Sequence, residues 1–263
     1  MKKNSPIGIF DSGVGGSSIW QEIHKYLPFE HTIYLADSKN APYGNKSTNE
    51  ITQLSIKNTQ KLLDLGAKII VVACNTATTN AIVALREKFD VPIIGIEPAI
   101  KPAALQTTSK SIGILATKGT LSSALFSETT RIFTQDISVV EIIGEGLVPL
   151  IEAGNLTGDE MVLLLKKHTR PMIDANVDYI VLGCSHYPYI IPQLKKILPE
   201  NIKIIDSGEA VARQTKTVLQ SLNLLRIETS NPKLQFYTNA KIDTLKFLLR
   251  DYDSKITIEK IDF

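Results

Sequence analysis

The apolar residues of this chain occur mostly in short continuous runs that alternate with amphipathic stretches. Stretches with the apolar spacing of a helix include Asn49–Leu65 and Asp159–Ile173. The runs with strand character are Ile7–Phe10, Thr32–Ala36, Ile69–Ala73, Pro92–Ile96, Ser111–Ala116, Val139–Ile142, Tyr179–Leu182 and Ile202–Ile205. Strands that are apolar throughout and separated by helices are typical of parallel sheets buried on both faces. The pattern therefore predicts an α/β fold.

Several of these segments occur twice, in the same order, at an offset of roughly one hundred residues, which is a sign of internal duplication. The matching pairs are Ile7–Ser12 with Ile112–Thr117, the segment around Cys74 with that around Cys184, and Ile93–Glu97 with Lys203–Ser207. We therefore expect two similar lobes, each a mostly parallel sheet flanked by helices. Pseudo-twofold symmetry would relate the lobes, and an active site would lie in the cleft between them.

The connection between the two lobes is expected at Glu97–Pro102, where two prolines fit a boundary. The chain after Gly208 exceeds what the second repeat needs, which indicates a return to the first lobe. We predict a first lobe of residues 1–97 plus 208–263 and a second lobe of residues 98–207. Ligands in such sheets lie beyond the carboxyl ends of the strands.

Composition narrows the class of protein. The 263 residues are 43% hydrophobic and 21% charged, with a net charge of +2, which is too small to indicate a nucleic-acid or membrane surface. No apolar run approaches the ~20 residues of a membrane span. Two cysteines are too few for the disulfide framework of a chain this long, so reduced thiols in the cytoplasm are expected. We expect a small-molecule substrate and no nucleic-acid or membrane partner.

Each cysteine follows an apolar run, at the position where the cleft is expected. The two motifs are Cys74-Asn75-Thr76 and Cys184-Ser185-His186. A lone cysteine is more often a small buried hydrophobe. Polar neighbours at a strand end favour chemistry instead, because a helix N-terminus or a nearby cation lowers a thiol pKa from about 8.5 toward neutrality. Such a thiol is a usable acid or base, and Asn75, Thr76 and Ser185 offer hydrogen bonds to a carboxylate.

Other segments give weaker signals. Asp11 and Ser12 open a glycine-rich turn after the first strand, and the turn lacks the lysine of a P-loop. Asp11 suits an ammonium group, whereas Ser12 and the turn amides suit a carboxylate. Tyr43 and Gly44 lie in a turn that would cover the cleft. Glu152 has the pattern of a solvated helix residue, although it falls near the cleft.

The histidines are interpreted by their surroundings. His186 lies two residues after Cys184 and would tune that thiol or protonate a group. The other three, His24, His31 and His168, occupy amphipathic or turn segments and are expected at the surface.

Three interpretations of the cysteine pair remain open at this point. Two thiols on opposite sides of a substrate suit racemisation, in which one removes a proton and the other returns one. Cys74, Cys184 and His186 also have the donor types of a Cys₂His zinc site with an open position. A non-catalytic two-lobe protein that binds an amino acid is the third interpretation.

Taken together, these segments resemble the aspartate/glutamate racemase family over nearly the whole chain. The matching motifs are Asp11–Gly16, Pro42–Gly44, Ala73–Thr78, Gly95–Ala99, Leu115–Thr120, Gly183–Pro188 and Ile205–Ala210. The resemblance implies interconversion of L- and D-glutamate without a cofactor or a metal, with aspartate as the alternative substrate. It further implies a role in peptidoglycan synthesis and a homodimer.

The resemblance also assigns roles to residues. Cys74 and Cys184 would be the two catalytic acid/bases, and Asp11, His186 and Glu152 would assist them. The substrate contacts would be Asp11, Ser12, Tyr43, Gly44, Asn75, Thr76, Ser185 and His186. The chain departs from the family in two places. Ser185 stands where threonine is usual, and the stretch Ser17–Trp20 is less apolar than the family's helix start.

Overall fold

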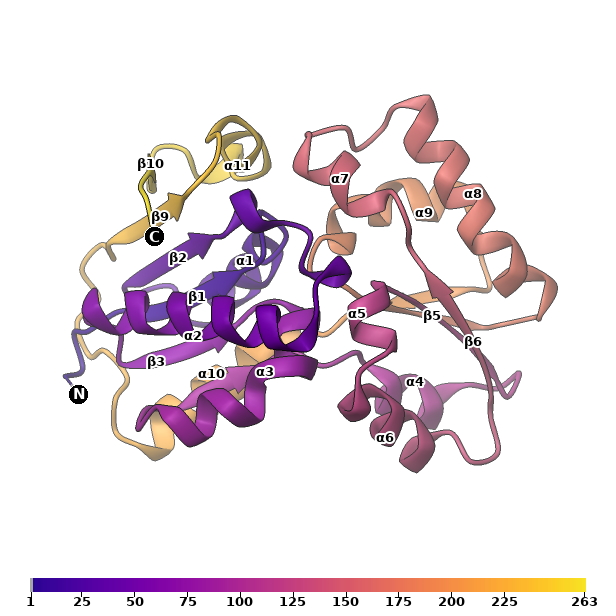
Figure 1. Cartoon of the computed structure of the whole chain (residues 1–263), viewed down its shortest axis with the longest axis horizontal. Helices are drawn as coiled ribbons and strands as arrows, with labels where there is room; N and C mark the ends of the chain where they lie inside the picture. Colours follow the sequence, from indigo (N-terminus) through magenta and orange to yellow (C-terminus); the bar gives the residue numbers. More distant parts are fainter. Residues whose placement is uncertain (1) are drawn as a thin grey trace.

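The computed structural model describes residues 2–263, so residue 1, the start of the expected first lobe, lies outside the described residues. The first lobe contains a six-stranded parallel sheet with the order β10-β9-β2-β1-β3-β4. Its strands are β1 (Ile7–Asp11), β2 (Thr32–Ala36), β3 (Ile69–Val72), β4 (Ile93–Gly95), β9 (Leu234–Thr238) and β10 (Thr257–Lys260). This lobe lies on the left in Figure 1.

The second lobe contains a four-stranded parallel sheet with the order β6-β5-β7-β8. Its strands are β5 (Ser111–Ala116), β6 (Ser138–Ile143), β7 (Tyr179–Gly183) and β8 (Lys203–Ile205). In each half of the chain the second strand pairs with the first, the first with the third, and the third with the fourth. The predicted α/β class with two similar parallel sheets is confirmed, and the order of the strands repeats as the duplication requires.

Helices cover both faces of each sheet (Figure 1). Those of the first lobe are α1 (Ser17–Tyr26), α2 (Thr48–Asp64), α3 (Asn75–Lys88), α10 (Gly208–Ser221) and α11 (Asp243–Leu248). Those of the second lobe are α4 (Ile100–Gln106), α5 (Lys118–Leu121), α6 (Ala124–Phe133), α7 (Leu147–Glu152), α8 (Asp159–Asp174) and α9 (Ile191–Ile197). Short 3₁₀ helices are η1 (Ser38–Asn40), η2 (Tyr43–Asn45), η3 (Tyr187–Ile190) and η4 (Arg250–Tyr252).

The alternation of side chains along each strand divides the cores. In β1, Ile7 and Ile9 pack on the face covered by α1 and α10, whereas Phe10 packs on the face covered by α2 and α3. In the second lobe, Leu115 faces α7, α8 and α9, and Ile114 faces α4 and α6. Because helices cover both faces, the central strands β1, β3, β5 and β7 are buried and largely apolar, which is the pattern seen in the sequence.

The chain passes between the lobes twice. The loop after β4 leads into α4, and the loop after β8 leads into α10, so the expected boundaries at 97/98 and 207/208 fall in these two connections. Ser207 Oγ donates a hydrogen bond to the Glu97 carbonyl at 2.5 Å, which ties the two connections together. After α10 the chain returns to the first sheet, where β9 pairs with β2.

One expectation about the histidines is wrong. His168 is buried rather than exposed, and its Nε2 lies 2.9 Å from the carbonyl oxygen of Glu145. It occupies the inner face of α8, in helical register with Leu165 and Met172. Among residues 2–263, no helix combines the length and the apolar character that crossing a membrane requires.

Candidate active site

The two cysteines lie on different lobes and line the same cavity. Cys74 follows β3 and Cys184 follows β7, so both occupy the carboxyl end of a strand next to the first strand of its half. The cavity has a volume of about 10 Å³, which is close to the minimum for one water molecule. Its lining residues are Ser12, Pro42, Tyr43, Gly44, Cys74, Asn75, Thr76, Thr117, Val148, Cys184, Ser185 and His186.

Cys74 is held at the start of a helix. It is the N-cap of α3, and its Sγ accepts a hydrogen bond from the Ala77 N–H at 3.4 Å. The thiol in turn donates to Ser12 Oγ at 3.6 Å. Burial raises the pKa of the Cys74 thiol well above its ordinary value, and the nearby charge of Asp11 raises it further. The helix N-terminus opposes this shift, because its N–H groups favour the thiolate.

Cys184 lies beside a different set of polar groups from those around Cys74. His186 Nδ1 lies 3.7 Å from Cys184 Sγ, and His186 Nε2 lies 2.5 Å from Glu152 Oε1. Burial disfavours the imidazolium, but the bonds to Cys184 and Glu152 outweigh it and hold the His186 pKa well above its ordinary range. The arrangement is that of a thiol, a base that shares its proton, and a carboxylate that orients the base.

Glu152 is a contact between the lobes rather than a solvated residue. Its side chain is only 17% exposed, which contradicts the solvated position expected from its pattern. Besides His186, its carboxylate accepts hydrogen bonds from the Val14 N–H at 2.7 Å and from Ser38 Oγ at 2.9 Å. Its carbonyl oxygen accepts from Thr244 Oγ1 at 2.8 Å. Glu152 therefore orients His186 from behind the cavity and joins α7 to three segments of the first lobe.

Asp11 also lies behind the cavity. It is fully buried and accepts hydrogen bonds from the Gly16 N–H at 2.8 Å, from the Gly13 N–H at 3.3 Å and from Ser185 Oγ at 3.2 Å. Burial raises the Asp11 pKa, while the charge of His186 and the Gly16 N–H act in the opposite direction. Asp11 thus fixes the glycine-rich turn and orients the hydroxyl that follows Cys184.

Tyr43 is positioned by a buried polar network. Its hydroxyl donates to Asp37 Oδ2 at 2.5 Å and accepts from Asn58 Nδ2 at 3.1 Å. Burial and the Asp37 charge raise the Tyr43 pKa far above its ordinary value, so the phenol stays protonated. Asp37 also accepts from Asn40 and Asn239, which fixes the loop that carries Tyr43 and Gly44 into the cavity lining.

Asn75 is a buried polar side chain without a partner. Only 2% of it is exposed, and neither Nδ2 nor Oδ1 makes a hydrogen bond. Leaving such groups unpaired costs about 1–3 kcal/mol each, so an unpaired group in a native protein needs an explanation. The explanation lies in its position: Asn75 lines the cavity and presents both a donor and an acceptor there.

Of the eleven site residues expected from the sequence, nine line the cavity. The two carboxylates Asp11 and Glu152 lie behind it and contact Ser185 and His186, respectively. Three lining residues were not expected, namely Pro42, Thr117 and Val148. Thr117 Oγ1 lies 2.8 Å from Thr76 Oγ1, across the interface of the lobes. A signal for Thr117 was present, because the internal repeat aligns Ile112–Thr117 with Ile7–Ser12.

Glycines permit the close approach of the lobes at this site. A Cβ atom on Gly13 would overlap the Glu152 carboxylate, and one on Gly15 would overlap the His186 ring. The glycine-rich turn therefore offers a surface without side chains, against which Glu152 and His186 pack.

Comparisons with known proteins show which proteins this chain resembles. A family model described as Asp/Glu/Hydantoin racemase matches residues 7–215. A glutamate racemase of Herpetosiphon aurantiacus is 42% identical over 237 residues, which are 90% of this chain and 93% of that protein. The crystal structure of glutamate racemase isoform RacE1 from Bacillus anthracis superposes with a TM-score of 0.86 at 30% identity, covering 99% of this chain and 98% of that one.

A second solved structure is the Escherichia coli glutamate racemase in complex with L-glutamate and the activator UDP-MurNAc-Ala. It superposes with a TM-score of 0.86 at 34% identity, covering 98% of this chain and 98% of that one. Both lobes and their relative placement are therefore shared with proteins of known structure.

Proposed function

This chain belongs to the Asp/Glu/hydantoin racemase family and is a racemase, and from this premise we propose that it interconverts L- and D-glutamate by a two-base mechanism. The observation that carries the proposal is the placement of Cys74 and Cys184, one on each lobe, in the lining of one cavity. A substrate held between them would present opposite faces of its α-carbon to the two thiols.

In the proposed reaction one cysteine acts as a thiolate and the other as a thiol. The thiolate takes the α-proton, so the C–H bond breaks, an S–H bond forms and the electron pair stays on the substrate. The opposite thiol then gives its proton to the other face of the α-carbon and becomes a thiolate. Atoms and charge balance without any redox step, and the product enantiomer is processed with the roles exchanged.

The lining groups suit an amino acid. The first N–H groups of α3 have no carbonyl partner within the helix and favour an anion, so the start of α3 suits a carboxylate. Asn75, Thr76 and Ser185 add side-chain hydrogen bonds next to it. The cavity of about 10 Å³ is smaller than glutamate, so substrate entry requires the lobes to move apart.

The substrate is assigned from relatives. Curated relatives of 40–45% identity act on glutamate by name, and one solved relative holds L-glutamate. Aspartate is the second candidate. We further propose that the D-glutamate serves peptidoglycan synthesis, and a cytoplasmic location and a homodimer stay predictions.

Incubation with L- or D-glutamate in D₂O tests the proposal. Each enantiomer should gain α-deuterium as it racemises, with no added cofactor, and aspartate should react more slowly. Cys74→Ser and Cys184→Ser should each abolish racemisation, because a hydroxyl is a far weaker acid than a thiol. Serine keeps the N-cap oxygen that Ala77 needs, so the Cys74→Ser variant should fold normally.

The outcomes separate the alternatives. Wild-type turnover in either serine variant would contradict the two-base mechanism. Tight glutamate binding without α-proton exchange would indicate a binding protein instead. Stoichiometric zinc in protein purified without added metal, with activity lost on chelation, would support the zinc interpretation.

A further inference from the structure

The start of α1 contacts the second lobe through two buried serine hydroxyls. Ser17 is fully buried and Ser18 is 8% exposed, although both lie in the first turn of the helix. These residues begin the stretch 17–20, which is more polar than the helix start of the family that the chain resembles. Buried hydroxyls are almost always hydrogen-bonded, so the partners of these two show what the stretch does.

Ser17 belongs to a chain of hydrogen bonds whose direction can be assigned. Its Oγ lies 2.5 Å from the Val14 carbonyl oxygen and 2.6 Å from Tyr189 Oη. A carbonyl can only accept, so Ser17 donates its one proton to Val14. Tyr189 must then donate to Ser17, and the Tyr189 oxygen accepts from Gln21 Nε2 at 3.4 Å. Each hydroxyl proton is thus committed to one partner.

This chain continues to the catalytic histidine. The Val14 N–H donates to Glu152, and Glu152 also bonds His186 Nε2. A backbone hydrogen bond links Tyr189 to His186, because the Tyr189 N–H donates to the His186 carbonyl at 3.3 Å. The bonds therefore form a closed circuit through His186, Glu152, Val14, Ser17 and Tyr189, with two crossings between the lobes.

Ser18 adds a second connection to the same segment. Its Oγ donates to the carbonyl oxygen of Ser185 at 2.8 Å, and both atoms are buried. Ser185 is the residue between Cys184 and His186. The first turn of α1 thus holds the Cys184 segment at its backbone through Ser18 and at Tyr189 through Ser17.

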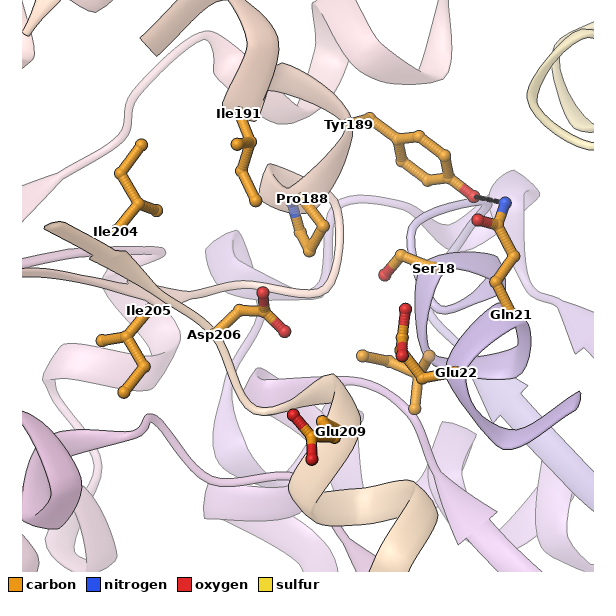
Figure 2. Close-up of a pocket in the computed structure, with 11 residues that line it drawn as sticks. Ser18, Gln21, Glu22, Pro188, Tyr189, Ile191, Ile204, Ile205, Asp206 and Glu209 are labelled. Atoms are coloured by element: carbon orange, nitrogen blue, oxygen red, sulfur yellow. Dashed lines mark hydrogen bonds between the residues drawn. The ribbon is translucent and has the colours of Figure 1, made fainter. Parts of the chain in front are cut away.

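Two cavities flank this contact, and the Tyr189 ring also packs against an apolar core in each lobe. Tyr189 and Gln21 both line a cavity of about 500 Å³ on one side and another of about 350 Å³ on the other. Figure 2 shows Tyr189 extending from its 3₁₀ turn to Gln21 on α1, with Ser18 beside the cavity. Apolar contacts therefore hold the Tyr189 ring, whereas the hydrogen bonds of Tyr189 and Ser18 set the orientation in which the Cys184 segment meets α1.

We propose that Ser17, Ser18 and Tyr189 are positioning residues for the second base: they hold Cys184 and His186 against the first lobe in the geometry that proton transfer needs. The proposal rests on the proposed function, because it concerns the thiol that the racemase mechanism uses. It also provides a role for the polar start of α1 in this chain.

Tyr189→Phe, Ser17→Ala and the double variant test the circuit. Each single change removes one hydroxyl of the same bond and should lower kcat/KM for glutamate by roughly fivefold, the worth of one buried hydrogen bond. The double variant should fall no further than the single variants, because both break one connection. The alkaline limb of the pH profile of kcat/KM should move to lower pH, since the segment that carries His186 is held less firmly and the bond from His186 to Glu152 weakens. Ser18→Ala should lower kcat/KM independently.

Two control variants remove comparable hydroxyls elsewhere. Tyr179→Phe removes a buried phenol at the other end of β7, which contacts Gln106 and Lys203, and Ser55→Ala removes a buried hydroxyl that bonds Ile51. Both should keep the wild-type kcat/KM and pH profile even where they lower the melting temperature.

Multiplicative losses in the double variant, or an unchanged pH profile in folded Tyr189→Phe protein, would overturn the proposal. Tyr189→Phe keeps the ring, so it remains decisive if Ser17→Ala fails to fold. All variants are compared with wild-type activity. Failure of the proposed function would appear in the wild type itself, as an absence of α-deuterium incorporation.

Discussion

Glu152→Gln probes the connection between the lobes at the active site. The substitution keeps the size of the side chain and removes its charge. Glu152 accepts three hydrogen bonds, at 2.5, 2.7 and 2.9 Å, and its side chain is 17% exposed, so solvent screens them little. A hydrogen bond to a charged group contributes about 1.5–3 kcal/mol and a neutral one about 0.5–1.5 kcal/mol, so the loss is about 1 kcal/mol per bond.

Three bonds therefore amount to about 3 kcal/mol. Since about 1.4 kcal/mol corresponds to a factor of ten, kcat/KM should fall by about 100-fold if the whole loss appears in the transition state. The factor must be equal for L- and D-glutamate, because the equilibrium constant between enantiomers is one. Unequal factors would expose an error in the assay.

The pH profile should change in a defined direction. Glu152 helps to hold the His186 pKa above its ordinary value, so a neutral glutamine side chain in its place should let that pKa fall. The alkaline limb of kcat/KM should then move to lower pH. Circular dichroism with each enantiomer between about pH 6 and 10, around the unperturbed His and Cys values, measures both effects.

Glu128→Gln is the matched control, because Glu128 is exposed on α6. This variant should leave kcat/KM and its pH profile unchanged. The reasoning would be refuted if the Glu152→Gln protein kept the wild-type pH profile and its kcat/KM fell by less than about threefold, which is less than the worth of one hydrogen bond.

Three further predictions concern the site and the core. Gly15→Ala should reduce kcat/KM by more than about 100-fold and cost about 1–3 kcal/mol of stability, because its Cβ would displace the buried His186 ring; steady-state kinetics and thermal melts check this. Asp11→Asn should be more stable than wild type at pH 7 but less active. The pKa of Asp11 in the folded protein is raised above 3.8, so the wild type loses stability as the pH rises from 3.8 through that folded pKa. Urea unfolding between about pH 4 and 7 should show that the stability difference between the variant and the wild type shrinks toward acid pH. Lys68→Met should cost about 3–5 kcal/mol of unfolding free energy, because it leaves the buried Glu30 carboxylate without its ammonium partner, yet the activity of the folded fraction should persist.

The sequence predicted the framework of the fold well. All eight strand-like runs became strands, with ends shifted by at most one residue, because most of these strands are covered on both faces and are therefore largely apolar. The last two strands were not predicted. In β9 buried and partly exposed residues alternate, and in β10 every residue is at least partly exposed, so neither forms a continuous apolar run.

The sequence predicted the two cysteines of the site better than the surroundings of its other residues. Cys74 and Cys184 stood out because a matched pair of motifs at strand ends is visible in one dimension. The pattern alone misjudged the burial of Glu152, because its partners Val14, Ser38 and His186 come from three distant segments. His168 was misplaced for a similar reason: helical periodicity does not show which face a neighbouring element covers.

The sequence by itself thus determined which residues form strands, that the chain is duplicated, and which thiols and polar residues lie at the strand ends. These properties depend on local apolar patterning and on repetition. Only the tertiary structure decided that the carboxylates lie behind the cavity, that Glu152 joins the lobes, and that the serines at the start of α1 hold the Cys184 segment. Those facts depend on hydrogen bonds between residues more than one hundred positions apart, and their geometry exists only when the two lobes meet.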